Sequence, residues 1–145
     1  MSRLTLDQAS VIADAALAEG ARRNLAPLAI VVLDAGSHAL VTKRHEDAGL
    51  YRTTIATAKA AGCLGMGYGG RELARRAAAV PALYAAVNAV TDQGLVALPG
   101  GVLIRDAEGV VIGAAGCSGD TADQDEACLL AGIAAAGLVA ETGAA

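Results

Sequence analysis

The chain has 145 residues and a net charge of −4 at neutral pH, with a pI of about 5.0. Its length fits one domain spanning residues 1–145. An acidic chain without a basic run is poorly suited to bind nucleic acid or an anionic membrane surface, so neither is expected as a partner.

Hydrophobic residues make up 54% of the chain, yet aromatic residues make up only 2%, and Trp and Phe are absent. The core must therefore be aliphatic. A short chain with such an apolar surplus is expected to bury more surface by forming a homo-oligomer. No apolar stretch reaches the roughly 18 residues of a membrane span, and the first residues lack the apolar segment of a signal peptide. We therefore expect a cytoplasmic protein.

The first predicted helix begins after Thr5, because Thr5 and Gln8 have the spacing of a capping box. Asn24 and Pro27 are expected to end it. Small and apolar residues recur at helical spacing on one of its faces: Ala9, Ile12, Ala13, Ala16 and Leu17. The apolar run 28–33 predicts a strand, residues 34–37 a turn, and residues 39–42 a second strand.

Helices are predicted over residues 50–64, 71–80 and 82–90, with a glycine cluster at 65–70. Residues 94–101 are expected to form a loop or a frayed edge strand. A second hairpin follows over 102–119 and turns at 106–109. The last helix starts at another capping box, Thr121 and Gln124, and is expected to run to about Glu141.

This order of elements predicts the fold class. The strands come in hairpins, so the sheet should be mostly antiparallel. Strands do not alternate with single helices, as they would in a doubly wound fold. We therefore predict an α/β protein of the α+β type.

The stretch GAAGCSG at residues 113–119 leaves one strand end with few side chains. Glycine inside a strand often marks close approach by a ligand or by another backbone. Ser118 and the neighbouring amides could hold a polar ligand group, although a second subunit packed on Gly116 explains the pattern equally well. Asp125 and its acidic neighbours follow at a helix N-terminus, where the helix dipole favours negative charge.

Gly100 and Gly101 precede the other strand of that hairpin and should lie near the same end of the sheet. Consecutive glycine amides can form a concave donor site, but a plain turn also fits.

Most of the polar chemistry lies between residues 43 and 59. Arg44 and His45 close a predicted strand, and Tyr51 and Lys59 follow on one face of the next helix. Lys59 lies among alanines. It could act as a base or Schiff-base amine beside a pocket, or it could extend its stem along apolar surface toward water.

His45 could bind haem iron or act as a general base, or it could be a solvated residue at a strand end. No two histidines have a metal-binding spacing, so no metal site made of protein ligands alone is expected. Haem needs only one axial donor. The three cysteines contain no C-x-x-C pair, so neither a disulfide framework nor a zinc knuckle is expected.

Several motifs occur together: the Lys59-Ala60 step, LPGG at 98–101, VIGAAGCSG at 111–119, and DQDEA at 123–127 followed by Ala131-Gly132. In this combination the chain resembles the GlcG/HbpS-like family, also called the haem-degrading or DUF336 family, which includes the C-terminal domain of PduO-type cobalamin adenosyltransferases. The resemblance covers nearly the whole chain.

The resemblance implies a profilin-like five-stranded antiparallel sheet flanked by helices and assembled into oligomers, often octamers. It implies a ligand pocket at the glycine-rich end of the sheet, with haem or a compact polar, anionic metabolite as ligand. The residues that it assigns to this pocket are Arg44, Tyr51, Lys59, Gly100, Gly101, Gly116 and Ser118, with Asp125 near the rim.

Three functions stay open at this point. The first is a small-molecule-binding protein with that pocket. The second is an enzyme on the same scaffold, with Lys59 or His45 as base and backbone amides at Gly100, Gly101 or Ser118 as oxyanion donors. The third is a structural oligomer without ligand chemistry.

Overall fold

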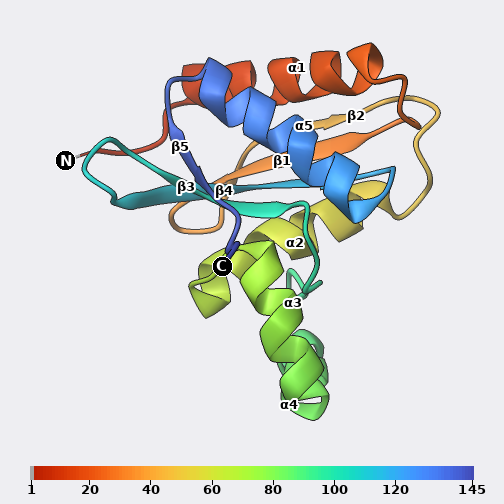
Figure 1. The fold of residues 1–145 in the computed structure, drawn as a ribbon, viewed down its shortest axis with the longest axis vertical. Coiled ribbons are helices and arrows are strands. Elements are labelled where there is room, and N and C mark those ends of the chain that lie inside the picture. The colour runs from red at the N-terminus through yellow and green to blue at the C-terminus, as the bar shows by residue number, and fades with distance from the viewer. Residues whose placement is uncertain (1) are drawn as a thin grey trace.

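A single antiparallel sheet organises the chain in a computed structural model that describes residues 2–145 (Figure 1). Its five strands lie in the order β2-β1-β4-β3-β5. They are β1 (Ala29–Asp34), β2 (Ala39–Arg44), β3 (Gly101–Arg105), β4 (Val111–Ser118) and β5 (Val139–Glu141). The predicted α+β class and the five-stranded antiparallel sheet are confirmed.

Helices cover both faces of the sheet. α1 (Leu6–Arg22) and α5 (Ala122–Ala135) pack side by side on one face, and α2 (Arg52–Met66) covers the other (Figure 1). α3 (Gly70–Ala79) and α4 (Pro81–Val90) follow α2, and α4 projects away from the sheet.

The strands divide the core into two layers because alternate side chains point to opposite faces of a sheet. Ile30 and Val32 of β1 pack with α1 and α5. Val31 and Leu33 pack with α2 and α3. The central strands are buried on both faces, which explains why β1 reads as a continuous apolar run.

The capping box predicted for α1 is present: the Thr5 amide donates to Gln8 Oε1, and the Gln8 amide donates to Thr5 Oγ1. At α5, Thr121 Oγ1 accepts from the Gln124 amide, so the predicted helix start is also confirmed. Residues 94–100 form a loop rather than a strand.

The predicted length of the last helix is wrong. α5 ends at Ala135, and residues 139–141 form β5 on the edge of β3 instead. Gly137 has a φ of 73°, a left-handed conformation that ends helices. The chain then reverses, and Leu138 and Ala140 pack against the core under α1 and α5.

Among residues 2–145, no helix combines the length and the apolar character needed to span a bilayer.

Candidate functional site

Three strand ends meet at one end of the sheet. Ala29 pairs with Arg44 on one side and with Ser118 on the other, so β2 and β4 end next to the start of β1. Gly101 pairs with Gly116 one strand further along. The structure therefore brings the predicted Arg44, Ser118 and Gly101 to the same end of the sheet.

A buried ion pair lies beneath this end. Lys59 of α2 is 3% exposed and Asp125 of α5 is 1% exposed. Lys59 Nζ lies 3.2 Å from Asp125 Oδ2 and donates to the Cys117 carbonyl at 3.0 Å. Asp125 Oδ1 accepts from the Asp120 amide at 3.0 Å. The pair links α2 on one face of the sheet to α5 on the other, and the bond from Lys59 to the Cys117 carbonyl links α2 to the end of β4.

Burial raises the pKa of Asp125, while the Asp120 amide and the Lys59 ammonium oppose that rise. Burial also raises the pKa of the Cys117 thiol, and the nearby Asp125 carboxylate adds to the effect. Cys117 is therefore a thiol and not a nucleophilic thiolate at neutral pH.

The two glycines of the LPGG stretch make room for Lys59. Gly100 has a φ of 98°, and a Cβ there would lie 2.8 Å from Lys59 Nζ. A Cβ on Gly101 would lie 2.6 Å from the Lys59 carbonyl oxygen. For these glycines we predicted a concave donor site or a plain turn, and the structure packs the side chain and backbone of Lys59 in α2 against them.

At Gly116 the neighbouring backbone is α2. A Cβ on Gly116 would lie 1.9 Å from the Ala56 carbonyl oxygen and 3.2 Å from the Ala60 amide. We expected a ligand or a second subunit against this strand, and the structure instead packs a helix of the same chain on it. Gly116 therefore packs on α2, and Lys59 of the same helix is buried.

Ser118 is buried, and its hydroxyl accepts a hydrogen bond from Arg52 Nη1 at 3.2 Å. Arg52 was not among the predicted site residues. Its spacing from Ser118, 66 residues along the chain, gives no signal in a single sequence. Tyr51 caps α2 and is 70% exposed, so it does not converge with the buried Lys59.

A cavity of about 540 Å³ opens beside the same sheet end, between the end of α1 and the end of β2. We call it the α1–β2 pocket. Its lining residues are Leu17, Gly20, Ala21, Leu25, Ala26, Pro27, Leu28, Thr42, Lys43, Arg44 and His45. Most of the wall is apolar or small, and Lys43, Arg44 and His45 supply the ionisable groups. Cavities of this size commonly hold small ligands.

Arg44 shapes the rim of the α1–β2 pocket. Its Nη1 donates to the carbonyls of His45, Glu46 and Ala48 at 3.0–3.2 Å, which fixes the loop that follows β2. Lys43 Nζ lies 2.5 Å from Asp14 Oδ1 on α1. The Arg44 guanidinium is therefore engaged by backbone carbonyls, and its bond to the His45 carbonyl fixes the backbone of His45.

The His45 ring is held in one orientation. Its Nδ1 accepts from the Asp47 amide at 3.0 Å, so the proton of the neutral ring lies on Nε2. An imidazole that ligates iron through Nε2 carries its proton on Nδ1 instead. As held here, His45 fits hydrogen-bond donation to a carboxylate and does not fit axial ligation of haem iron.

No group of three His, Cys, Asp or Glu side chains within residues 2–145 is placed to hold a metal ion. Lys59 and Tyr51 do not line the α1–β2 pocket, whereas Arg44 and His45 do.

Solved structures of other proteins are similar to this chain in fold and sequence. A PduOC–haem complex has 25% identity and a TM-score of 0.83 over 95% of this chain and 98% of its own. HbpS has 29% identity and a TM-score of 0.79 over 92% and 90%. Protein ORFY of Klebsiella pneumoniae, at 24% identity and a TM-score of 0.83 over 94% and 93%, shares the fold.

A comparison with curated proteins returned no match. The family model described as "Haem degrading protein HbpS-like" matches residues 4–134. That match covers most of the sheet and the helices on both of its faces, including Lys59, the LPGG stretch and the glycine-rich β4. The chain therefore belongs to the HbpS-like haem-degrading protein family.

Proposed function

We propose that this protein binds a small anionic molecule with an apolar body in the α1–β2 pocket, and that it does so as a homo-oligomer. One observation carries the proposal. The pocket combines an apolar wall with consecutive ionisable side chains Lys43, Arg44 and His45 at one rim. An apolar surface with a few polar groups that fix orientation is typical of ligand sites.

His45 supplies the directional contact. Its Nδ1 is engaged by the Asp47 amide, so Nε2–H is the donor of the neutral ring, and Glu46 Oε1 lies 3.7 Å from Nε2. A ligand carboxylate at the rim would accept from Nε2 in place of Glu46, beside the ion pair of Lys43 with Asp14. A hydrogen bond to a charged group contributes about 1.5–3 kcal/mol, which is roughly one to two powers of ten in affinity.

Haem is the second candidate, because family members include a protein solved with haem. Haem has an apolar face and carboxylates, so it shares the required chemistry. Ligation of its iron by His45 would require the ring to give up the Asp47 bond, at a cost of about 1 kcal/mol. A haem titration followed at the Soret band separates the two candidates.

The pocket itself is tested by filling it. Ala21 lines the pocket and is exposed, whereas Ala18 is exposed on the same helix and does not line it. With the anionic dye anilinonaphthalene sulfonate as probe, Ala21→Trp should lower the affinity at least tenfold. Ala18→Trp should leave it unchanged. Equal affinities for the two variants would show that the α1–β2 pocket is not the site.

A further inference from the structure

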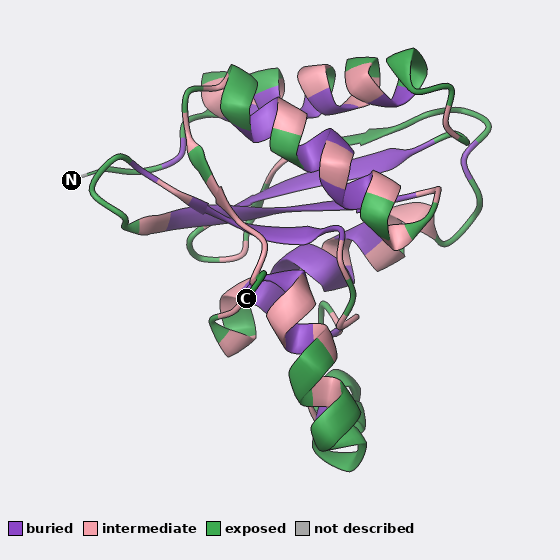
Figure 2. Cartoon of the chain, viewed as in Figure 1, coloured by how far each residue is buried: buried purple, intermediate pink, exposed green. Residues whose placement is uncertain are grey.

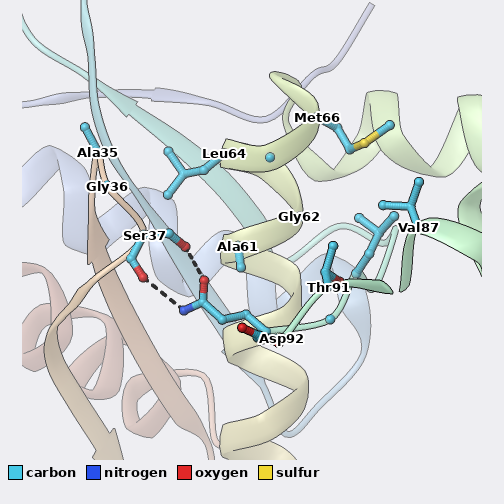
Figure 3. A pocket seen from close by; sticks show the side chains of 14 residues that line it. Ala35, Gly36, Ser37, Ala61, Gly62, Leu64, Met66, Val87, Thr91 and Asp92 are labelled. Atoms are coloured by element: carbon cyan, nitrogen blue, oxygen red, sulfur yellow. Dashed lines mark hydrogen bonds between the residues drawn. The ribbon is translucent and has the colours of Figure 1, made fainter. Parts of the chain in front are cut away.

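A second cavity, of about 520 Å³, lies between the outer end of α2, the loop after α4 and the turn between β1 and β2 (Figure 3). It is lined by residues 35–37, which follow β1, whereas the α1–β2 pocket is lined by Leu28, which precedes β1. The two cavities therefore lie at opposite ends of β1. They also lie beside helices on opposite faces of the sheet, α2 and α1.

Much of the wall of the second cavity is apolar. Leu64 of α2, Val87 of α4 and Leu95 of the loop after α4 line it. Gly65 of α2 also lines it, and a Cβ there would meet nothing within 4 Å, so the helix leaves open space at this point. Such a wall suits the apolar body of a small ligand.

The loop after α4 is fixed by hydrogen bonds. Ser37 Oγ donates to Gln93 Oε1 at 2.5 Å, and Gln93 Nε2 donates to the Ser37 carbonyl at 2.9 Å (Figure 3). The Leu95 amide donates to Asn88 Oδ1 at 2.7 Å. Ser37 has a φ of 66°, which is uncommon for a residue other than glycine and persists where surrounding contacts hold it. The cavity is therefore formed before a ligand arrives, which lowers the ordering cost of binding.

Asp92 gives the second cavity its charge. Of the described residues that line the cavity, Asp92 is the one with a charged side chain. It is exposed, and among residues 2–145 it has no ion-pair partner. The α1–β2 pocket differs, because its ionisable residues are Lys43, Arg44 and His45. The two cavities therefore favour ligands of opposite charge.

We propose that the second cavity binds a small organic cation, an ammonium group on an apolar body, with Asp92 as its counter-charge. The apolar body would lie against Leu64, Val87 and Leu95, and the ammonium would donate to the Asp92 carboxylate. The net charge of −4 on the chain adds to the attraction of a cation. A ligand that also carries a carboxylate would find no cationic side chain in the described lining, so amines without an acid group fit best.

A ligand in the second cavity should also stabilise α4. Of the residues in α4 only Tyr84 is buried, and Figure 2 shows α4 as the most exposed helix of the molecule. A helix of ten residues is marginal in water without tertiary packing. Because Val87 and Leu64 line the same cavity, a bound ligand adds a contact between α4 and α2. Exchange of the α4 amide hydrogens should become slower when the ligand is bound.

Three probes with one apolar body test the charge preference: phenethylammonium, neutral phenethyl alcohol and anionic phenylacetate. In chemical-shift titrations that follow the amides of residues 93–95, the parent should bind phenethylammonium about two- to fivefold more tightly than phenethyl alcohol, the range expected for an exposed ion pair. Phenylacetate should bind most weakly. Asp92→Asn should remove the preference. Glu108→Gln, exposed in the turn between β3 and β4, removes the same charge and should keep it.

Filling the cavity tests its position. Gly65→Leu places a side chain in the open space beside α2, so it should abolish saturable binding of phenethylammonium and the slower exchange in α4, while circular dichroism shows the parental helix content. Equal parental affinities for phenethylammonium and phenethyl alcohol, a preference that survives in Asp92→Asn, or parental binding in Gly65→Leu would each overturn the proposal. Affinity for the anionic dye reports separately on the α1–β2 pocket and should stay parental in both variants.

Discussion

The ammonium group of Lys59 is buried with one carboxylate as its counter-charge, Asp125. Removing one member of a buried pair leaves the other without compensation and costs about 3–5 kcal/mol. In urea denaturation, Asp125→Asn and Lys59→Met should each lower the free energy of unfolding by that amount. The double variant should lose less than the sum. Additive losses would show that the two groups do not interact.

The deficit of Lys59→Met should depend on pH. Burial already raises the pKa of Asp125, and loss of the ammonium removes an opposing influence. A carboxyl with a raised pKa in the folded state favours folding at low pH, and this contribution disappears as pH rises through that pKa. Unfolding free energies of Lys59→Met and the parent should therefore differ less at about pH 5 than at about pH 8. A constant difference would contradict the assignment.

Gly116 tests the packing of α2 on β4. Its missing side chain lets the Ala56 carbonyl approach, so Gly116→Ala should lower the free energy of unfolding by at least about 2 kcal/mol. Gly65→Ala is the control, because it adds a methyl group in open space within a helix. That change should be neutral or stabilising by up to about 1 kcal/mol. Similar unfolding midpoints for the two variants would contradict the close approach.

At the scale of elements, Asp120 joins the loop after α1 to the turn before α5. Its carboxylate accepts from the Ala26 and Thr121 amides, and these bonds lower its pKa. A carboxylate with a lowered pKa contributes stability above its ordinary value, near 3.9, and loses it as pH falls through the lowered pKa. Because Ala26 lines the α1–β2 pocket, this bond also positions one pocket wall.

Acid should therefore destabilise the parent more than Asp120→Asn. Thermal unfolding midpoints measured between about pH 5 and 2 should fall more steeply for the parent. Asp106→Asn is the matched control. The pKa of Asp106 is also lowered by backbone amides, but these belong to the β3–β4 turn, which lies outside the α1–β2 pocket. Dye affinity at neutral pH should fall in Asp120→Asn and stay unchanged in Asp106→Asn. Equal dye affinities for Asp120→Asn and Asp106→Asn would show that the hydrogen bond between Asp120 and Ala26 does not position the pocket wall.

At the scale of the whole molecule, the sheet separates the α1–β2 pocket from a second cavity. The α1–β2 pocket opens beside α1 on one face, and a cavity of about 520 Å³ lies beside the end of α2 on the other (Figure 3). A side chain that fills the first cavity should therefore not disturb the second. Ala21→Trp should lower dye affinity while the helix content, measured by circular dichroism, stays parental.

Local signals in the sequence determined most of the elements. The capping residues Thr5 and Thr121 marked two helix starts, and the apolar run 28–33 marked the central strand. These features depend on neighbours within a few residues, which a single sequence contains. β5 was missed because residues 139–141 follow a helical pattern, and only pairing with β3 makes them a strand. The number of strands came from the family resemblance.

Only the tertiary structure decided which groups the predicted site residues contact. The sequence singled out Lys59, Gly100, Gly101, Gly116 and Asp125 as unusual, and the structure packs them against one another or against α2. Of the predicted site residues, Arg44 and His45 line an open cavity, and Ser118 accepts a hydrogen bond from Arg52, which was not predicted. A glycine in a strand signals close approach but not which group approaches. That group is set by contacts between residues far apart in the chain, such as Ala56 with Gly116 and Lys59 with Asp125, which local pattern does not encode.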